Sequence, residues 1–203
     1  MLSELQADSL RELGNIGAAH AATTLSTMLS AQIEMTVPDL KILDVSRIHE
    51  FIGDDPAAVV IFEIQCDIAG AGYIILQVPH ESVIRLTNAM LGTNEEKRGL
   101  TEMDQSALLE VGNIMASAFL DATAGLLEIM MLPSPPELII DMPLAAVETL
   151  LASQAAGSIS EVVLFCTELS SDQYRIDSNI FLLPNERLLD ELVKMLENLV
   201  NKP

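Results

Sequence analysis

The sequence contains few of the residue types on which metal and redox centres depend. It has no tryptophan, two cysteines and three histidines, and only 3% of its residues are aromatic. Zinc sites use cysteine and histidine in closely spaced pairs, whereas Cys66, Cys166, His20, His49 and His80 are widely separated. We therefore predict no metal site and no cofactor of the protein's own.

Basic residues are also scarce. The chain has 10 Lys and Arg against 30 Asp and Glu, which gives a formal net charge of −20. An acidic surface repels nucleic-acid phosphates and anionic lipid headgroups, so we expect neither nucleic acid nor a membrane as a partner. Two explanations of the acidity remain open, a salt-rich cytoplasm and a basic surface on a partner.

Long apolar runs are missing as well. No stretch reaches the roughly 18 residues of a membrane-spanning helix, and residues 1–6 lack the basic segment of a signal peptide. We therefore expect a cytoplasmic protein. Cys66 and Cys166 lie in apolar, strand-like segments, where they form either a disulfide or two buried thiols. A reducing cytoplasm favours the thiols.

One segment of the sequence occurs twice. Residues 8–17 read DSLRELGNIG, and residues 106–115 read SALLEVGNIM. A repeat of this kind determines the architecture before any local prediction is made. The aligned positions include Asp8 with Ser106, Glu12 with Glu110, Asn15 with Asn113, and Pro38 with Pro136.

Both copies have the apolar spacing of a long helix. We predict helices from about Ser3 to Met28 and from Thr101 to Met130, with Ser3 and Thr101 as N-caps. Apolar residues as far as Leu126 are expected to face inward in the second helix. On the opposite face of each helix, a carboxylate and an amide lie one turn apart.

A solvated helix face would explain a single Glu-x-x-Asn. Two copies are harder to explain in this way, because asparagine and glycine are poor helix formers and an interior glycine costs about 1 kcal/mol relative to alanine. A Gly-Asn pair in the middle of both helices indicates that something approaches closely or that the amide is required.

The spacing of the four repeated positions resembles the active-site signature of the CheC/CheX/FliY family of phosphatases. Members of this family hydrolyse the aspartyl phosphate of phosphorylated CheY, the chemotaxis response regulator. The resemblance covers the whole chain. The double signature and the length favour the CheC branch, because CheX carries one copy and FliY adds a peptide and a switch domain.

The resemblance implies a role for each signature residue. Asparagine positions the attacking water, and glutamate pairs with the active-site lysine of the response regulator. The remaining positions support the site, although the prolines could equally end strands, and the aspartate and serine could be ordinary polar helix residues. The expected catalytic residues are Glu12, Asn15, Glu110 and Asn113, and the supporting residues are Asp8, Pro38, Ser106 and Pro136.

The resemblance also implies partners. Phosphorylated CheY is the substrate, Mg²⁺ is expected only in the pocket of that partner, and the receptor-modifying deamidase CheD is a possible second partner. The alternative function is a non-catalytic adaptor that binds phosphorylated CheY, CheD or both. Both Glu–Asn pairs are intact, which favours the enzyme.

The predicted fold class is α/β. Residues 1–98 and 99–203 form two repeats of a helix, about three strands and a shorter helix, packed around a pseudo-twofold axis as one domain, because a single unit leaves strand edges and an apolar helix face uncovered. A short helix at 143–151 is expected in the second half only. The predicted hairpin strands are 58–67 with 71–78, and 160–167 with 174–183.

Overall fold

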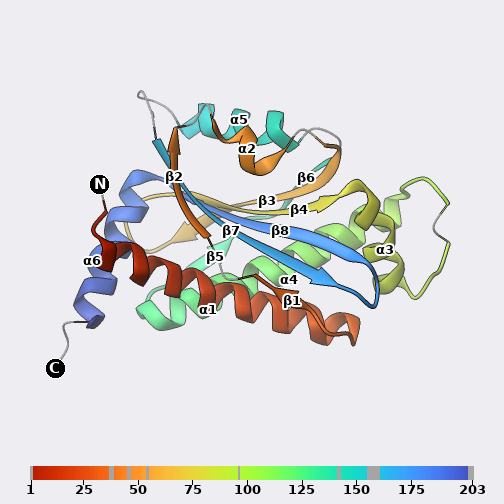
Figure 1. Ribbon diagram of the computed structural model, residues 1–203, viewed down its shortest axis with the longest axis horizontal. Helices are drawn as coiled ribbons and strands as arrows, with labels where there is room; N and C mark the ends of the chain where they lie inside the picture. The colour runs from red at the N-terminus through yellow and green to blue at the C-terminus, as the bar shows by residue number, and fades with distance from the viewer. Residues whose placement is uncertain are drawn as a thin grey trace.

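The computed structural model describes residues 2–36, 39–44, 47–53, 55–95, 97–140, 143–154 and 161–200. One sheet lies between two layers of helices (Figure 1). The first half contains α1 (Glu4–Leu29), β1 (Glu34–Met35), β2 (Asp39–Asp44), α2 (His49–Ile52), β3 (Ala57–Cys66), β4 (Gly72–Pro79) and α3 (His80–Leu91). The second half contains α4 (Glu102–Leu127), β5 (Met131–Pro133), β6 (Glu137–Ile140), α5 (Pro143–Gln154), β7 (Glu161–Ser171), β8 (Ile176–Pro184) and α6 (Glu186–Val200).

The two halves repeat the same order of elements, which confirms the predicted fold class. Helices α1 and α4 both have 26 residues, and each begins with a capping box. In this motif the N-cap hydroxyl accepts a hydrogen bond from the third backbone N–H of the helix, and the side chain at that third position bonds back to the cap. The capping pairs are Ser3 with Gln6, and Thr101 with Asp104.

The sheet is built from strands that the two repeats exchange. Its order is β1-β7-β8-β4-β3-β5, with β2 also paired to β7 and β6 to β3. The short strands of each repeat therefore extend the hairpin of the other repeat. The equivalent strands β4 and β8 lie side by side and antiparallel at the centre, with Leu76 opposite Ile180, so the pseudo-twofold axis passes between them.

The structure adds detail to each predicted repeat. Two short strands, rather than one, follow each long helix. The short helix that we expected in the second half only is α5, and it has a counterpart in α2, a single turn at His49–Ile52. That prediction was wrong because a four-residue helix is too short to produce a periodic apolar pattern.

Hydrophobic residues are buried on both faces of the sheet. The larger core lies between the sheet and helices α1, α3, α4 and α6, and a smaller one lies under α2 and α5. Strand β3 is accordingly buried at six consecutive positions, 57–62, as expected for a strand covered on both sides. The prediction for Leu126 was wrong, since its side chain is 39% exposed.

Helices α1 and α4 pack directly against each other, and Gly17 lies at their contact. A β-carbon at Gly17 would lie 2.8 Å from the buried ring of Phe119. We expect Gly17→Ala to lower the free energy of unfolding by about 2 kcal/mol, because a tightly packed core accommodates an added methyl group only by distortion. Urea unfolding measures this change.

The matched control is Gly125→Ala on α4, where a β-carbon would meet no atom within 4 Å. At this site the higher helix propensity of alanine should raise stability by up to about 1 kcal/mol. Equal effects of the two substitutions would contradict the proposed role of Gly17 in the helix contact.

Candidate active site

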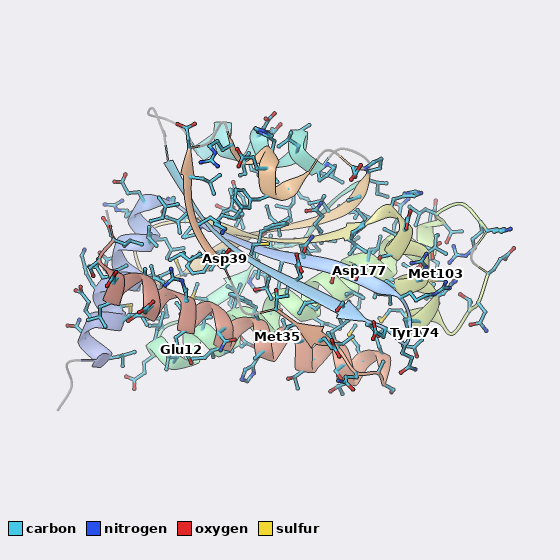
Figure 2. The ribbon with its side chains drawn as sticks, in the orientation of Figure 1. Glu12, Met35, Asp39, Met103, Tyr174 and Asp177 are labelled. Atoms are coloured by element: carbon cyan, nitrogen blue, oxygen red, sulfur yellow. The ribbon has the colours of Figure 1, made fainter. Side chains whose placement is uncertain are left out.

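The structure places the predicted catalytic residues on the two longest helices. Glu12 and Asn15 lie on α1, and Glu110 and Asn113 lie on α4. In both copies the glutamate is exposed and the asparagine is half-buried. Figure 2 shows Glu12 on the outer side of α1, directed away from the sheet. The helices thus present two equivalent Glu–Asn pairs on the surface.

The glycine before the second asparagine has a structural explanation. A β-carbon at Gly112 would lie 2.8 Å from Cγ1 of Val60 on β3, so the glycine lets α4 pack closely on the sheet. Gly14 is likewise buried on α1. The close approach at Gly112 therefore occurs inside the protein, whereas packing does not explain the half-buried Asn15 and Asn113, which form no side-chain hydrogen bond with the described residues.

The four catalytic candidates have no partner within the described part of the chain. Neither glutamate forms an ion pair there, and neither asparagine amide forms a side-chain hydrogen bond. Their polar atoms are available to another molecule.

The supporting positions differ between the two copies. The carboxylate of Asp8 is exposed and accepts a hydrogen bond of 2.5 Å from Nη1 of Arg11. Its counterpart Ser106 is also exposed, but it carries no charge. The first site therefore has an ion pair one turn before its asparagine that the second site lacks.

The signature prolines lie beyond the helices in the sequence. Pro136 is half-buried and directly precedes β6, the strand that packs against α4. The position of Pro136 is consistent with a role in directing the chain into that strand, because proline fixes one backbone angle. Pro38 lies outside the described residues.

The two Glu–Asn pairs are separate sites. Helices α1 and α4 run in opposite directions (Figure 1) and touch where Gly17 meets Phe119. Glu12 and Glu110 precede this contact on their own helices, so they lie on opposite sides of it. At a rise of about 1.5 Å per residue, the two glutamates are about 20 Å apart along the helix axes.

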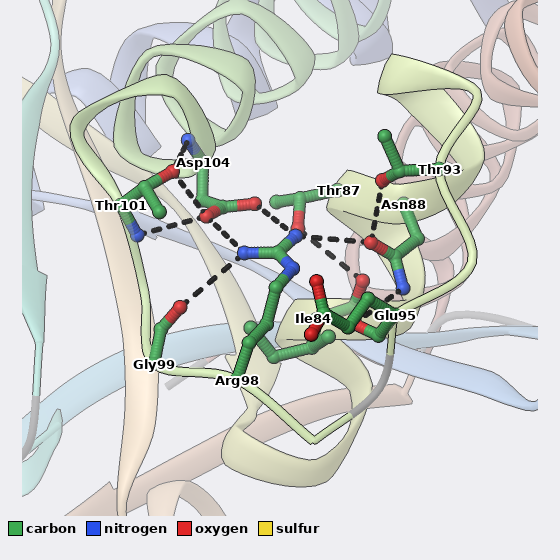
Figure 3. A network of polar contacts seen from close by, with 9 residues as sticks. All are labelled: Ile84, Thr87, Asn88, Thr93, Glu95, Arg98, Gly99, Thr101 and Asp104. Carbon is green, nitrogen blue, oxygen red and sulfur yellow. Dashed lines mark hydrogen bonds and ion pairs between the residues drawn. The ribbon is translucent and has the colours of Figure 1, made fainter.

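A buried ion pair holds the start of α4, and sequence reasoning missed it (Figure 3). Asp104 is fully buried, and its two carboxylate oxygens accept hydrogen bonds of 2.5 and 2.7 Å from the guanidinium of Arg98. Thr101 donates to the same carboxylate from its backbone N–H and its hydroxyl. Arg98 also donates to the side-chain carbonyl of Asn88 on α3.

These contacts hold the pKa of Asp104 far below its usual range. The hydrogen bond from Arg98 is the largest cause, burial opposes it, and hydrogen bonds from Thr101 and Thr87 add to the lowering. The carboxylate is therefore ionised at neutral pH, and through Arg98 it joins the loop before α4 to α3. From the sequence, only the N-cap Thr101 was predicted in this region.

Other kinds of chemistry have little support in the described residues. No group of three His, Cys, Asp or Glu side chains among them could hold a metal ion. Cys66 and Cys166 are free thiols, and burial raises the pKa of Cys166 to about 11, which makes it a weak nucleophile at neutral pH. None of the helices in the described ranges has the length and apolar character of a membrane span.

Comparison with solved structures identifies the fold. Thermotoga maritima FliY aligns with 98% of this chain and 98% of its own, at a TM-score of 0.77 and 22% identity. The FliM middle domain of H. pylori aligns with 96% of this chain and 99% of its own, at a TM-score of 0.65 and 9% identity. Identities this low establish a shared fold and nothing about activity.

Comparison with known sequences identifies the family. A model of the CheC-like family matches residues 5–42 and 103–140, the segments that contain the two signature copies. The CheY-P phosphatase CheC of Bacillus subtilis is 32% identical over 94% of this chain and 93% of its own. The family predicted from the signature is thereby confirmed, and the protein belongs to the CheC-like family.

Proposed function

We propose that this protein is a phosphatase that hydrolyses the aspartyl phosphate of a phosphorylated CheY-type response regulator, with one site on α1 and one on α4. The observation that carries the proposal is the repeated Glu–Asn pair, an exposed glutamate with a half-buried asparagine, without a partner in the described residues. The relative with 32% identity is named as a CheY-P phosphatase, which supports the same activity here.

Hydrolysis of an aspartyl phosphate requires little covalent chemistry from the phosphatase. Water attacks the phosphorus, the bond from phosphorus to the aspartate oxygen breaks, and carboxylate and inorganic phosphate are released. The main requirement is a water molecule in line with the breaking bond. In this proposal Asn15 or Asn113 holds it, because an amide oxygen accepts a hydrogen bond from water while the amide nitrogen donates one to a neighbouring oxygen.

The two glutamates have a different proposed role. Glu12 and Glu110 pair with the active-site lysine of the response regulator and so orient the complex. Each glutamate is exposed and lies one helical turn from its asparagine, so a partner that contacts the asparagine can contact the glutamate as well. The strongly acidic surface, with a net charge of −20, favours approach of a basic patch on the partner.

Mg²⁺ enters the proposal only through the partner, whose acidic pocket holds it beside the phosphate. Asp8, Pro38, Ser106 and Pro136 are proposed to support the two pairs. The fold alone does not support the proposal, because folds are shared between proteins of very different sequence. The FliM middle domain, for example, has a related fold at 9% identity.

Phosphate release from a phosphorylated CheY-type regulator, measured with Mg²⁺ present, tests the proposal. The expected result is release well above the spontaneous rate, with turnover at substoichiometric protein. Spontaneous release at every protein concentration, with and without CheD, would contradict the phosphatase activity. Binding of the phosphorylated regulator without acceleration would then favour the adaptor.

A further inference from the structure

Two large apolar side chains lie exposed on the same helix faces as the proposed sites. Leu5 is 62% exposed in the first turn of α1, and Met103 is 63% exposed in the first turn of α4. Each lies two helical turns before the glutamate of its helix, on the same side of the helix. The two residues occupy equivalent positions in the repeats.

A single exposed apolar side chain needs no explanation in a soluble protein. The occurrence of exposed apolar residues at equivalent positions of both repeats does need one, because most of the other exposed large apolar residues are not repeated. The equivalents of Met130 and Leu132, which are 56% and 48% exposed, are the polar residues Gln32 and Glu34. Ile42 and Ile140 form the other exposed, equivalent pair in the described part of the chain, but they lie on β2 and β6.

We propose that Leu5 and Met103 are apolar anchors that dock the phosphorylated response regulator, each beside the Glu–Asn pair of its own helix. The inference rests on the proposed function and extends it to the surface around each pair. The regulator, rather than a second copy of this chain, is the occupant because the anchor and the Glu–Asn pair form one continuous helix face.

The dimensions of a protein interface support this assignment. A standard interface covers about 800 Å² on each partner, which corresponds to a disc of radius about 16 Å. Leu5 and Met103 lie about 10 Å along the helix axis from their glutamates and about 15 Å from their asparagines, within that radius. A regulator whose phosphoaspartate meets the asparagine therefore covers the anchor as well.

The different roles of the apolar and polar side chains follow from their chemistry. Glutamate and asparagine supply polar contacts that have to compete with water, whereas burial of an apolar side chain stabilises a complex without directional requirements. Leu5 and Met103 are accordingly expected to contribute to affinity for the regulator together with the glutamates, and the asparagines to determine the rate of the chemical step.

Variants in which only one of the two sites is active test each anchor separately. Leu5→Gln is made together with Asn113→Ala, and Met103→Gln together with Asn15→Ala, so that only the site beside the altered anchor remains active. We expect KM for the phosphorylated regulator to rise about tenfold, equivalent to about 1.4 kcal/mol, while kcat at saturating regulator is retained. An unchanged KM in both backgrounds, or a loss confined to kcat, would overturn the proposal.

Met130→Gln is the matched control. Met130 is similarly exposed, at 56%, but it follows the end of α4 and has a polar equivalent in the first repeat. Its substitution should leave KM unchanged. A rise equal to that of the anchor variants would reflect general surface hydrophobicity and overturn the proposal.

A binding measurement separates failure of this inference from failure of the proposed function. The regulator is activated with beryllofluoride, which imitates the aspartyl phosphate without being hydrolysed, and its affinity is measured for the wild type and for Leu5→Gln with Met103→Gln. Weaker binding by the double variant supports the anchors even if phosphate release is never accelerated. Equal affinities overturn the anchors even if the protein is an active phosphatase.

Discussion

Replacement of both Asn15 and Asn113 with alanine is expected to return phosphate release to the spontaneous rate. Correct alignment of a reacting water is worth several kcal/mol, so we expect a loss of about a hundredfold or more relative to the wild type. The assay follows phosphate release from the phosphorylated regulator with Mg²⁺. Each single substitution should remove only the share of its own site, because the two pairs lie about 20 Å apart along the helix axes.

The stability of these variants distinguishes a catalytic role from a structural one. Both asparagines lie in helix interiors, are half-buried and form no side-chain hydrogen bond with the described residues. Alanine has a higher helix propensity than asparagine by about 0.5 kcal/mol. The substitutions should therefore leave the melting temperature unchanged or raise it slightly. A double variant that releases phosphate at the wild-type rate would contradict the proposed role of the amides.

Substitution of the glutamates provides a contrast within the same assay. Glu12→Gln with Glu110→Gln removes the proposed ion pairs with the partner's lysine but leaves both amides in place. We expect this variant to lose affinity, with KM rising about tenfold and kcat less affected. The difference in KM between this variant and the wild type should diminish at high salt, because ions screen exposed charges.

Much of the architecture could be predicted because the chain repeats itself. The matching Glu and Asn positions aligned the two long helices, and Ser3 and Thr101 marked where they begin. The helix ends were less accurate. Helix α4 ends at Leu127, before the predicted Met130, and its C-cap Glu128 is left-handed with φ of 56°. Without a glycine at this position, the usual sequence signal for the end of a helix is missing.

The exchange of short strands between the repeats could not be predicted. Strand β2 pairs with β7, and β6 pairs with β3, so the partners come from opposite halves of the sequence. The catalytic candidates could be predicted because their residue types and spacing are local, whereas the contacts that position them involve residues far apart in the chain.

The buried ion pair of Asp104 and Arg98 was missed for a related reason. Arg98 lies in a charged connecting segment, where an exposed basic residue is the usual expectation. Only the packing of α3 against α4 encloses the pair. The first repeat has no such ion pair at the equivalent position, where Gln6 instead donates a hydrogen bond of 2.9 Å to Glu197 on α6.

Replacement of Asp104 with asparagine is expected to be strongly destabilising. Asp104 is fully buried and engaged by both terminal nitrogens of Arg98, so Asp104→Asn leaves the guanidinium of Arg98, which is only 17% exposed, without its counter-ion. Breaking a buried pair in this way costs about 3 kcal/mol, which lowers the melting temperature of a protein of this size by about 6–12 °C. Thermal unfolding at neutral pH measures the change.

Gln6→Ala is the matched control, because Gln6 occupies the equivalent position on α1. Its hydrogen bond to Glu197 is exposed, so the loss of this bond and of the capping contact should cost at most about 1 kcal/mol. Equal losses of stability in the two variants would show that capping, rather than the buried charge, accounts for the effect at Asp104.

The pH dependence of stability tests the same ion pair independently. The pKa of Asp104 is far below its usual range in the folded protein, whereas in the unfolded chain it is about 3.9. The unfolded state therefore binds the proton first as the pH falls, and the stabilisation by this carboxylate is complete above about pH 5 and declines below about pH 4. Urea unfolding of the wild type and of Asp104→Asn measures the difference in their free energies of unfolding between pH 6 and pH 3. This difference should be constant from pH 6 to about pH 5 and should be smaller by about 1 kcal/mol at pH 3. A difference that stays constant throughout would mean that Asp104 titrates alike in both states and that the contact with Arg98 does not favour the ionised form.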